Sequence, residues 1–203
     1  MDFKSYIRES FQMAAKNMQA VAESEELLNS FAAATHTIVE SYKKGGCLFI
    51  AGNGGSAADA QHISAELVGK LSKDRTPIRA FAMTVDTSFL TAVGNDYGYD
   101  FIFSRQVTGL MKPEDTFLAI STSGNSANIT KALEACRKVG AKSILLSGKD
   151  GGKAKSQNLA DHYIIAPGSN TANIQEAHIV TYHTLCFMVE KALVEAGIVK
   201  YTE

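Results

Sequence analysis

The feature of this sequence that most constrains its fold is a regular alternation of short apolar runs with segments of helical periodicity. The apolar runs are bounded by turn residues, as buried strands are, and they span residues 47–51, 80–85, 116–120, 143–146 and 163–166. The predicted helices between and after them span residues 56–71, 99–111, 126–139, 152–159 and 171–195. Because strand–helix–strand units favour parallel pairing, this order predicts an α/β fold, a doubly wound parallel sheet with helices on both faces.

Two further helices are predicted before the first strand. Apolar residues recur every three or four positions from Phe3 to Val21, and a second helical segment runs from about Glu25 to Lys44 and stops at a pair of glycines. A chain of 203 residues is within the range of one hydrophobic core, and no low-complexity tract or linker divides it. We therefore expect a single domain over residues 1–203, with N-terminal helices in 1–45 and an α/β core in 46–203.

Charge and composition exclude several classes of protein. The 20 Lys and Arg residues against 21 Asp and Glu give a formal charge of −1, without the basic excess of a nucleic-acid binder. No run of about 18 apolar residues predicts a membrane span, and early charged residues make a signal peptide unexpected. Cys47, Cys136 and Cys186 have neither metal-ribbon nor disulfide-framework spacing, so buried thiols are expected. These features predict a cytoplasmic protein that binds neither nucleic acid nor membrane.

Two loops at the expected carboxyl edge of the sheet are suited to bind an anion. The first contains Gly52, Gly54 and Gly55 and leads directly into a helix whose first N–H groups are unpaired. Three glycines exceed what a tight turn requires. The second loop carries four hydroxyl groups around one glycine, on Ser121, Thr122, Ser123 and Ser126. One serine could simply cap the next helix, but four hydroxyls before a helix start indicate a phosphate site.

Titratable side chains gather on two of the predicted helices. His62 and Glu66 are four residues apart and share a helix face, a spacing that a solvated surface pair would also show. On the last helix, Gln175 and His183 differ by roughly 80° around the axis, and His178 lies between them. Such groups suit proton transfer or a zinc site. Spacing does not bring the two helices together, so the pattern predicts only an enzyme acting on a phosphorylated small molecule.

Other glycine motifs leave one alternative open and exclude another. Gly52-x-Gly54-x-x-Ala57 matches a loose dinucleotide fingerprint, and Asp86 follows the second predicted strand, where a ribose-binding acid would lie. A small NAD-binding Rossmann protein is therefore an alternative, although it leaves the hydroxyl-rich loop without a function. The segment 148–154 resembles a nucleotide-binding P-loop, but its glycines are too close and Ala154 stands where a hydroxyl residue is required.

Taken together, these motifs resemble the sugar isomerase (SIS) family, and most closely its phosphoheptose isomerases. The resemblance runs from about Gly45 to Leu193. It is carried by GNGGSAADAQH-x3-E (52–66), GNDYG (94–98), FSRQV (103–107), ISTSGNSAN (120–128), LSGKDGG (146–152) and IQE-x-H-x4-H (174–183). Several long motifs in one order are far more specific than one glycine loop.

The resemblance implies a five-stranded parallel sheet in a three-layer α/β/α sandwich with an extra N-terminal helical segment. It also implies a homotetramer with active sites at subunit interfaces. The implied reaction converts sedoheptulose 7-phosphate to D-glycero-D-manno-heptose 7-phosphate, the first step of ADP-heptose synthesis for the lipopolysaccharide core. The family also contains non-catalytic proteins that regulate the replication initiator DnaA. Those regulators lack the motif Glu and second His, which are both present here as Glu66 and His183.

The resemblance further assigns roles to individual residues. The implied substrate-binding residues are Asn53, Gly54, Gly55, Glu66, Asn95, Asp96, Ser121, Thr122, Ser123, Ser126 and Gln175. The implied ligands of one zinc ion per subunit are His62, Glu66, Gln175 and His183. Glu66 would be the base at carbon and His183 the acid and base at the sugar oxygens. The sequence departs from the family pattern at Lys70, where Arg is usual, and at Ala172-Asn173.

Overall fold

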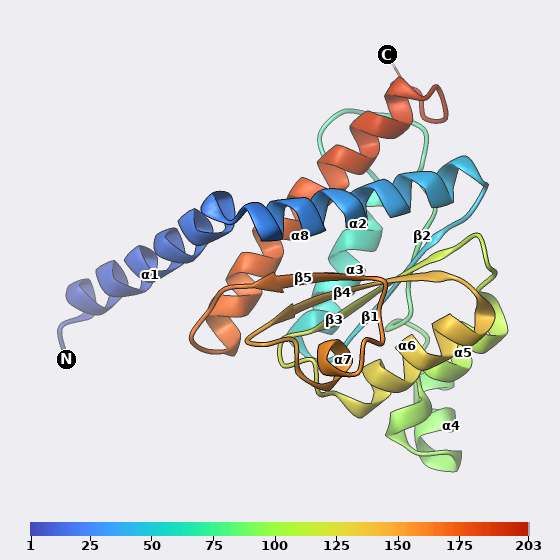
Figure 1. The fold of residues 1–203 in the computed structure, drawn as a ribbon, viewed down its shortest axis with the longest axis horizontal. Helices are drawn as coiled ribbons and strands as arrows, with labels where there is room; N and C mark the ends of the chain where they lie inside the picture. Colours follow the sequence, from blue (N-terminus) through green and yellow to red (C-terminus); the bar gives the residue numbers. More distant parts are fainter. Residues whose placement is uncertain (203) are drawn as a thin grey trace.

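The computed structural model of the chain describes residues 1–202, which form a five-stranded parallel sheet covered by helices (Figure 1). The strands are β1 (Leu48–Gly52), β2 (Ala80–Ala82), β3 (Thr116–Ser121), β4 (Lys142–Gly148) and β5 (His162–Ala166). Their order in the sheet is β2-β1-β3-β4-β5, and all neighbours are parallel. The predicted doubly wound sheet is therefore confirmed.

Eight α-helices and one short 3-10 helix (Tyr99–Phe101) accompany the sheet in the described residues. The α-helices are α1 (Phe3–Glu23), α2 (Glu25–Lys43), α3 (Gly55–Val68), α4 (Thr87–Asp96), α5 (Ser104–Leu110), α6 (Ala127–Val139), α7 (Gly152–Ser156) and α8 (Thr171–Glu195). Within residues 1–202, every helix is too short or too polar to cross a lipid bilayer.

Alternating strand residues build two separate cores on the two faces of the sheet. Leu48 and Ile50 of β1 pack with residues of α2, α3 and α8, whereas Phe49 and Ala51 pack with residues of α4 to α7. Successive side chains of a strand point to opposite faces, so one buried strand serves both cores. Figure 1 shows the resulting three layers, with α2 and α8 on one side and α5, α6 and α7 on the other.

The two N-terminal helices have different environments. The N–H of Leu27 donates to the Ser24 hydroxyl, which caps α2 and separates it from α1. α2 contributes buried side chains to the core that also contains α3 and α8. α1 projects away from the body of the molecule (Figure 1), and Asn17 is its one buried residue.

Several predicted elements have the wrong extent, and one was missed. No helix was predicted between residues 85 and 99, but α4 forms there because the Asp86 side chain accepts the Phe89 N–H at 2.9 Å and caps it. β2 ends at Ala82, before the predicted residue 85, because residues 83 and 84 form a turn that leads to the Asp86 cap. Val93 is buried and Phe89 and Leu90 pack partly buried on the same core, but a helix of ten residues gives this apolar pattern little length in the sequence.

Three predicted helices are shorter than expected. The segment predicted as one helix over 99–111 divides into the 3-10 helix Tyr99–Phe101 and α5, which begins only at Ser104. α3 stops at Val68, before Gly69, instead of residue 71. α7 stops at Ser156 instead of residue 159, since Asn158 adopts a left-handed conformation (φ 51°).

Candidate active site

The loop from β1 to α3 leaves the start of a helix open to a ligand. Gly54 occupies the N-cap of α3 with φ 55°, a conformation that favours glycine, and no side chain caps the helix. A Cβ on Gly55 would overlap the side-chain amide of Gln175, which comes from α8. The loop therefore combines free backbone N–H groups with one amide from the C-terminal helix.

The hydroxyl-rich loop after β3 is shaped in the same way. Ser126 is the N-cap of α6, yet its side chain makes no capping hydrogen bond; its Oγ instead lies 3.3 Å from Oγ of Ser121. The capping interpretation of this serine is therefore wrong, and its hydroxyl faces the loop. Gly124 has φ 63° and packs so closely on the Gly151 carbonyl that a Cβ would overlap it. Residues 148–154, which resemble a P-loop in sequence, thus pack against the hydroxyl-rich loop and support it.

A pair of asparagines joins the two loops. Asn53 and Asn128 exchange side-chain hydrogen bonds of 2.9 and 2.8 Å, and Asn128 is buried at the start of α6. The Tyr99 hydroxyl donates to Oδ1 of Asn53 at 3.1 Å. These contacts hold the carboxyl edges of β1 and β3 together, so the two anion-binding loops form one surface.

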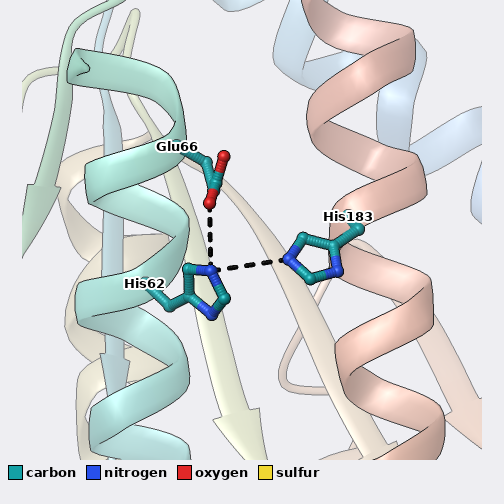
Figure 2. Close-up of side chains that lie close together, drawn as sticks. All are labelled: His62, Glu66 and His183. Carbon is teal, nitrogen blue, oxygen red and sulfur yellow. Dashed lines mark hydrogen bonds and ion pairs between the residues drawn. The ribbon is translucent and has the colours of Figure 1, made fainter. Parts of the chain in front are cut away.

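A second constellation lies further along α3, where it faces α8. Figure 2 shows His62, Glu66 and His183 pointing toward one another from the two helices. His62 Nε2 lies 3.0 Å from Glu66 Oε1 and 3.5 Å from His183 Nε2. The three ligand atoms lie within 4.8 Å of one another. The prediction from spacing that His62 and Glu66 share a face is confirmed, and the fold supplies the third member from 117 residues beyond Glu66.

The donor set of this cluster fits a metal ion. Two imidazole nitrogens and one carboxylate oxygen that converge on one point are a common ligand set for zinc, with a position left for water or substrate. The side chain of His62 is 45% exposed and that of Glu66 is 18% exposed, so an ion and a substrate can both reach them. The structure therefore contains a His/Glu/His group able to hold a metal.

Within one chain, Gln175 lies away from the cluster of His62, Glu66 and His183. It packs against Gly55, and it precedes His183 by eight residues, which is about 12 Å along the helix axis. Asn95 and Asp96 are exposed at the end of α4 and hydrogen-bond to each other at 2.8 Å. They lie shortly before Tyr99, whose hydroxyl contacts Asn53.

The two departures from the family pattern lie at the surface. Lys70 is exposed, two residues beyond the end of α3. Ala172 is also exposed, while Asn173 accepts a hydrogen bond of 2.8 Å from the Ser169 hydroxyl. Neither departure contacts the His62 cluster through a hydrogen bond within the described residues.

One histidine and the three cysteines are buried away from the two loops and from the cluster of His62, Glu66 and His183. His178 lies under the sheet edge, where its Nε2–H donates to the Ser147 carbonyl at 3.0 Å; burial lowers the pKa of His178, so its ring is neutral. Burial also raises the pKa of the Cys47 thiol to about 11, and of the Cys136 and Cys186 thiols to about 12. The prediction of buried thiols is confirmed, and they are poor nucleophiles at neutral pH.

Sequence reasoning missed several residues that support the site. Tyr182, whose hydroxyl lies 2.9 Å from His62 Nδ1, gave no signal because an aromatic residue in a long helix usually indicates core packing. Burial and the nearby Asp59 charge raise the pKa of Tyr182 to about 12. Arg75 lies in a loop between α3 and β2, where no periodicity exists, although its guanidinium is fully buried. Asn128 lies inside the ISTSGNSAN motif, which is the one sequence signal that could have identified it.

The family comparison and the similar proteins below agree with the resemblance to the SIS family. The SIS domain family matches residues 10–148. The chain is 44% identical over 195 residues to the phosphoheptose isomerase of Sulfurimonas denitrificans, which covers 96% of this chain and 99% of the relative. It is 45% identical over 188 residues to the phosphoheptose isomerase of Aneurinibacillus thermoaerophilus, with 93% of this chain and 94% of the relative covered.

Solved structures of such enzymes share the fold over nearly the whole chain. The phosphoheptose isomerase GmhA from Neisseria gonorrhoeae superposes with a TM-score of 0.85 at 36% identity, covering 93% of this chain and 98% of its own. A phosphoheptose isomerase from Francisella tularensis gives 0.88 at 34% identity, covering 94% and 100%. Neither alternative, an NAD-binding protein or a regulator of DnaA, gains support from these relatives. The chain is therefore an isomerase that belongs to the phosphoheptose isomerase family of SIS-domain proteins.

Proposed function

We propose that this enzyme converts sedoheptulose 7-phosphate to D-glycero-D-manno-heptose 7-phosphate. The observation that carries the proposal is the convergence of Glu66 and His183 from two facing helices in a chain that also presents two anion-binding loops. As the family resemblance implies, the product would enter ADP-heptose synthesis for the lipopolysaccharide core. A phosphorylated sugar as substrate and three buried free thiols both suit the reducing cytoplasm.

The hydroxyl-rich loop is proposed to bind the substrate phosphate. Ser121, Thr122, Ser123 and Ser126 offer short hydroxyl donors, and the uncapped start of α6 adds backbone N–H groups and the positive end of its dipole. Asn53, Gly54 and Gly55 would bind the sugar at the neighbouring loop, with Asn95 and Asp96 as further sugar contacts. These neutral donors account for phosphate capture by a protein of charge −1.

Glu66 and His183 are proposed to move the protons of the isomerisation. Interconversion of ketose and aldose requires removal of a proton from C1, formation of an enediol, and return of a proton to C2. The Glu66 carboxylate would accept the C1 proton and deliver it to C2. His183 would donate a proton to the oxygen at C2 and accept one from the oxygen at C1, so that the ring ends the cycle in its initial state.

His62, Glu66 and His183 are proposed to hold one zinc ion per subunit, and Gln175 is the proposed fourth ligand. When bound, a zinc ion acts as a Lewis acid that polarises the substrate carbonyl and makes the neighbouring C–H more acidic. Glu66 then has two roles, as ligand and as base. A carboxylate has two oxygen atoms, and His62 Nε2 lies close to one of them, so the other would be the one that accepts the proton.

We further propose a homotetramer in which active sites form between subunits. Phe3, Ile7 and Phe11 occupy one face of α1 and are 70%, 56% and 75% exposed, as expected of a surface that a second copy covers. The position of Gln175 supports a shared site, because it packs against Gly55 and precedes His183 by eight residues, which is about 12 Å of helix. A second copy would bring Gln175 and a phosphate loop to Glu66.

The reaction is tested by incubating the purified chain with sedoheptulose 7-phosphate and resolving ketose from aldose by chromatography. We expect aldose to accumulate, a chelator to lower the rate, and added zinc to restore it, because the metal polarises the carbonyl. Absence of turnover in every metal condition would refute the proposed reaction. Turnover that chelation leaves unchanged would refute a catalytic zinc ion and leave the isomerase assignment intact.

The assembly is tested by light scattering coupled to size exclusion. We expect four times the chain mass of 21.8 kDa. Phe11→Glu places a charge in the exposed apolar face of α1 and is expected to shift the protein to smaller species with lower turnover. Lys16→Glu, an exposed position on the same helix, is the matched control and should leave the mass unchanged. A monomeric parent protein with full turnover would contradict the shared site.

A further inference from the structure

The Tyr182 hydroxyl contacts His62, a proposed metal ligand, on the side of the ring opposite Glu66 and His183. Tyr182 Oη lies 2.9 Å from Nδ1 of His62, the ring nitrogen that points away from Glu66 and His183. Tyr182 is 1% exposed, so water does not compete for this contact. Its ring meets the His62 ring edge-on at 5.5 Å and the His183 ring at 4.9 Å. One side chain therefore packs against both histidines and bonds to one of them.

A buried carboxylate lies on the other side of the same hydroxyl. Asp59 is on α3, three residues before His62, and it is 8% exposed. Its Oδ2 atom is buried and makes no hydrogen bond within the described residues. Burial and then the Asp59 charge raise the pKa of Tyr182, so the carboxylate acts on the Tyr182 hydroxyl. A buried carboxylate oxygen without a donor costs free energy, so its retention here calls for a functional reason.

The chemistry of a ligating histidine supplies that reason. When Nε2 of His62 is a metal ligand, the ring proton is on Nδ1 and needs an acceptor. The Tyr182 hydroxyl can accept that proton's hydrogen bond and donate its own hydrogen to Asp59. When Nε2 instead carries the proton and donates to Glu66, the same hydroxyl can rotate and donate to Nδ1. A hydroxyl serves both states because it is both donor and acceptor.

We propose that Tyr182 and Asp59 are positioning residues that orient His62 and fix its metal-binding tautomer through the chain Asp59, Tyr182 hydroxyl, His62 Nδ1. This inference rests on the proposed metal site. Histidine ligands in metalloproteins commonly donate their second N–H to a carboxylate or a carbonyl group. Here the hydroxyl of Tyr182 is interposed, and the buried Asp59 supplies the carboxylate.

Tyr182→Phe tests the proposal because it keeps the ring packing and removes only the hydroxyl. We expect zinc affinity, measured on the full chain by competition with a chromophoric chelator, to fall about 10- to 100-fold. Visible absorption of the Co²⁺-substituted protein should change as well, since a reoriented His62 alters the ligand field. Asp59→Asn should weaken zinc binding in the same direction and to a smaller extent. It also provides the test if Tyr182→Phe does not fold.

Tyr42→Phe is the matched control. Tyr42 is also buried, and its hydroxyl donates to the Arg79 carbonyl at 2.7 Å and not to any of the proposed metal ligands. It should lose similar stability and keep the parent zinc affinity. Affinity within twofold of the parent in both Tyr182→Phe and Asp59→Asn, or an equal loss in Tyr42→Phe, would overturn this inference while the metal site stands. A parent protein that binds no zinc would overturn both.

Discussion

Glu66→Gln is expected to lower turnover by about 10²- to 10⁴-fold, the usual contribution of a general base, while the chain remains folded. Glutamine has the shape of glutamate, and its Oε1 can still accept a hydrogen bond from His62 Nε2, which lies 3.0 Å from the native carboxylate. The amide cannot accept a proton from carbon. The loss should therefore appear in kcat rather than in substrate affinity. The measurement is the initial rate of aldose formation at saturating zinc, which separates loss of the base from loss of the metal.

His183→Gln is expected to show a comparable loss, because His183 is the residue that α8 contributes to the cluster with Glu66. Exchange of the C1 proton with deuterated solvent distinguishes the two variants: Glu66→Gln should abolish exchange, since no base removes the proton.

Glu176→Gln is the matched control. Glu176 is an exposed carboxylate on α8, and its one side-chain hydrogen bond within residues 1–202 is from the Asn173 amide, at 3.3 Å; its replacement should leave turnover unchanged. Full activity in Glu66→Gln would refute the proposed mechanism.

Removing one partner of the Arg75–Glu190 ion pair is expected to cost about 3–5 kcal/mol of unfolding free energy. The pair is 2.6 Å long, and its side chains are 0% and 4% exposed, so either charge left alone would be buried and unpaired. The Arg75 guanidinium also donates to the carbonyls of Glu66 and Leu67, each at 2.8 Å. It therefore satisfies the last turn of α3 and ties that helix to α8, which carries His183.

The two single variants are Arg75→Met and Glu190→Gln, with unfolding followed in urea at one fixed protein concentration. Lys142→Met is the matched control. Lys142 pairs with Asp161 at 2.7 Å, but its side chain is 63% exposed, so the expected cost is about 0–1 kcal/mol. Arg75→Met combined with Glu190→Gln should cost less than the sum of the two singles, since no buried charge remains. Single variants that unfold like the Lys142 control would contradict this account.

The parts of the molecule that the sequence predicted are those encoded by local pattern. Short apolar runs between helical segments predict parallel strands, and the five strands occur where the runs occur. The loop of Gly54 and the loop of Ser121 are both predicted at the carboxyl edge of the sheet, where such folds bind ligands; their contact follows from the adjacency of β1 and β3 in the folded sheet. α4 escaped prediction because it has only ten residues and starts at the Asp86 cap, so its apolar face of Phe89, Leu90 and Val93 covers little more than one turn.

The sequence by itself determined the sheet, the glycine and hydroxyl loops, and the pairing of His62 with Glu66 on one helix face. Only the tertiary structure decided that His183 joins that pair while Gln175 lies beside Gly55. The tertiary structure also decided which residues support the site: Asp59 acts on Tyr182, and Arg75 joins the end of α3 to Glu190. Periodicity fixes which residues share a face within one helix. Which faces of α3 and α8 meet is set by packing across the sheet, between residues far apart in the chain.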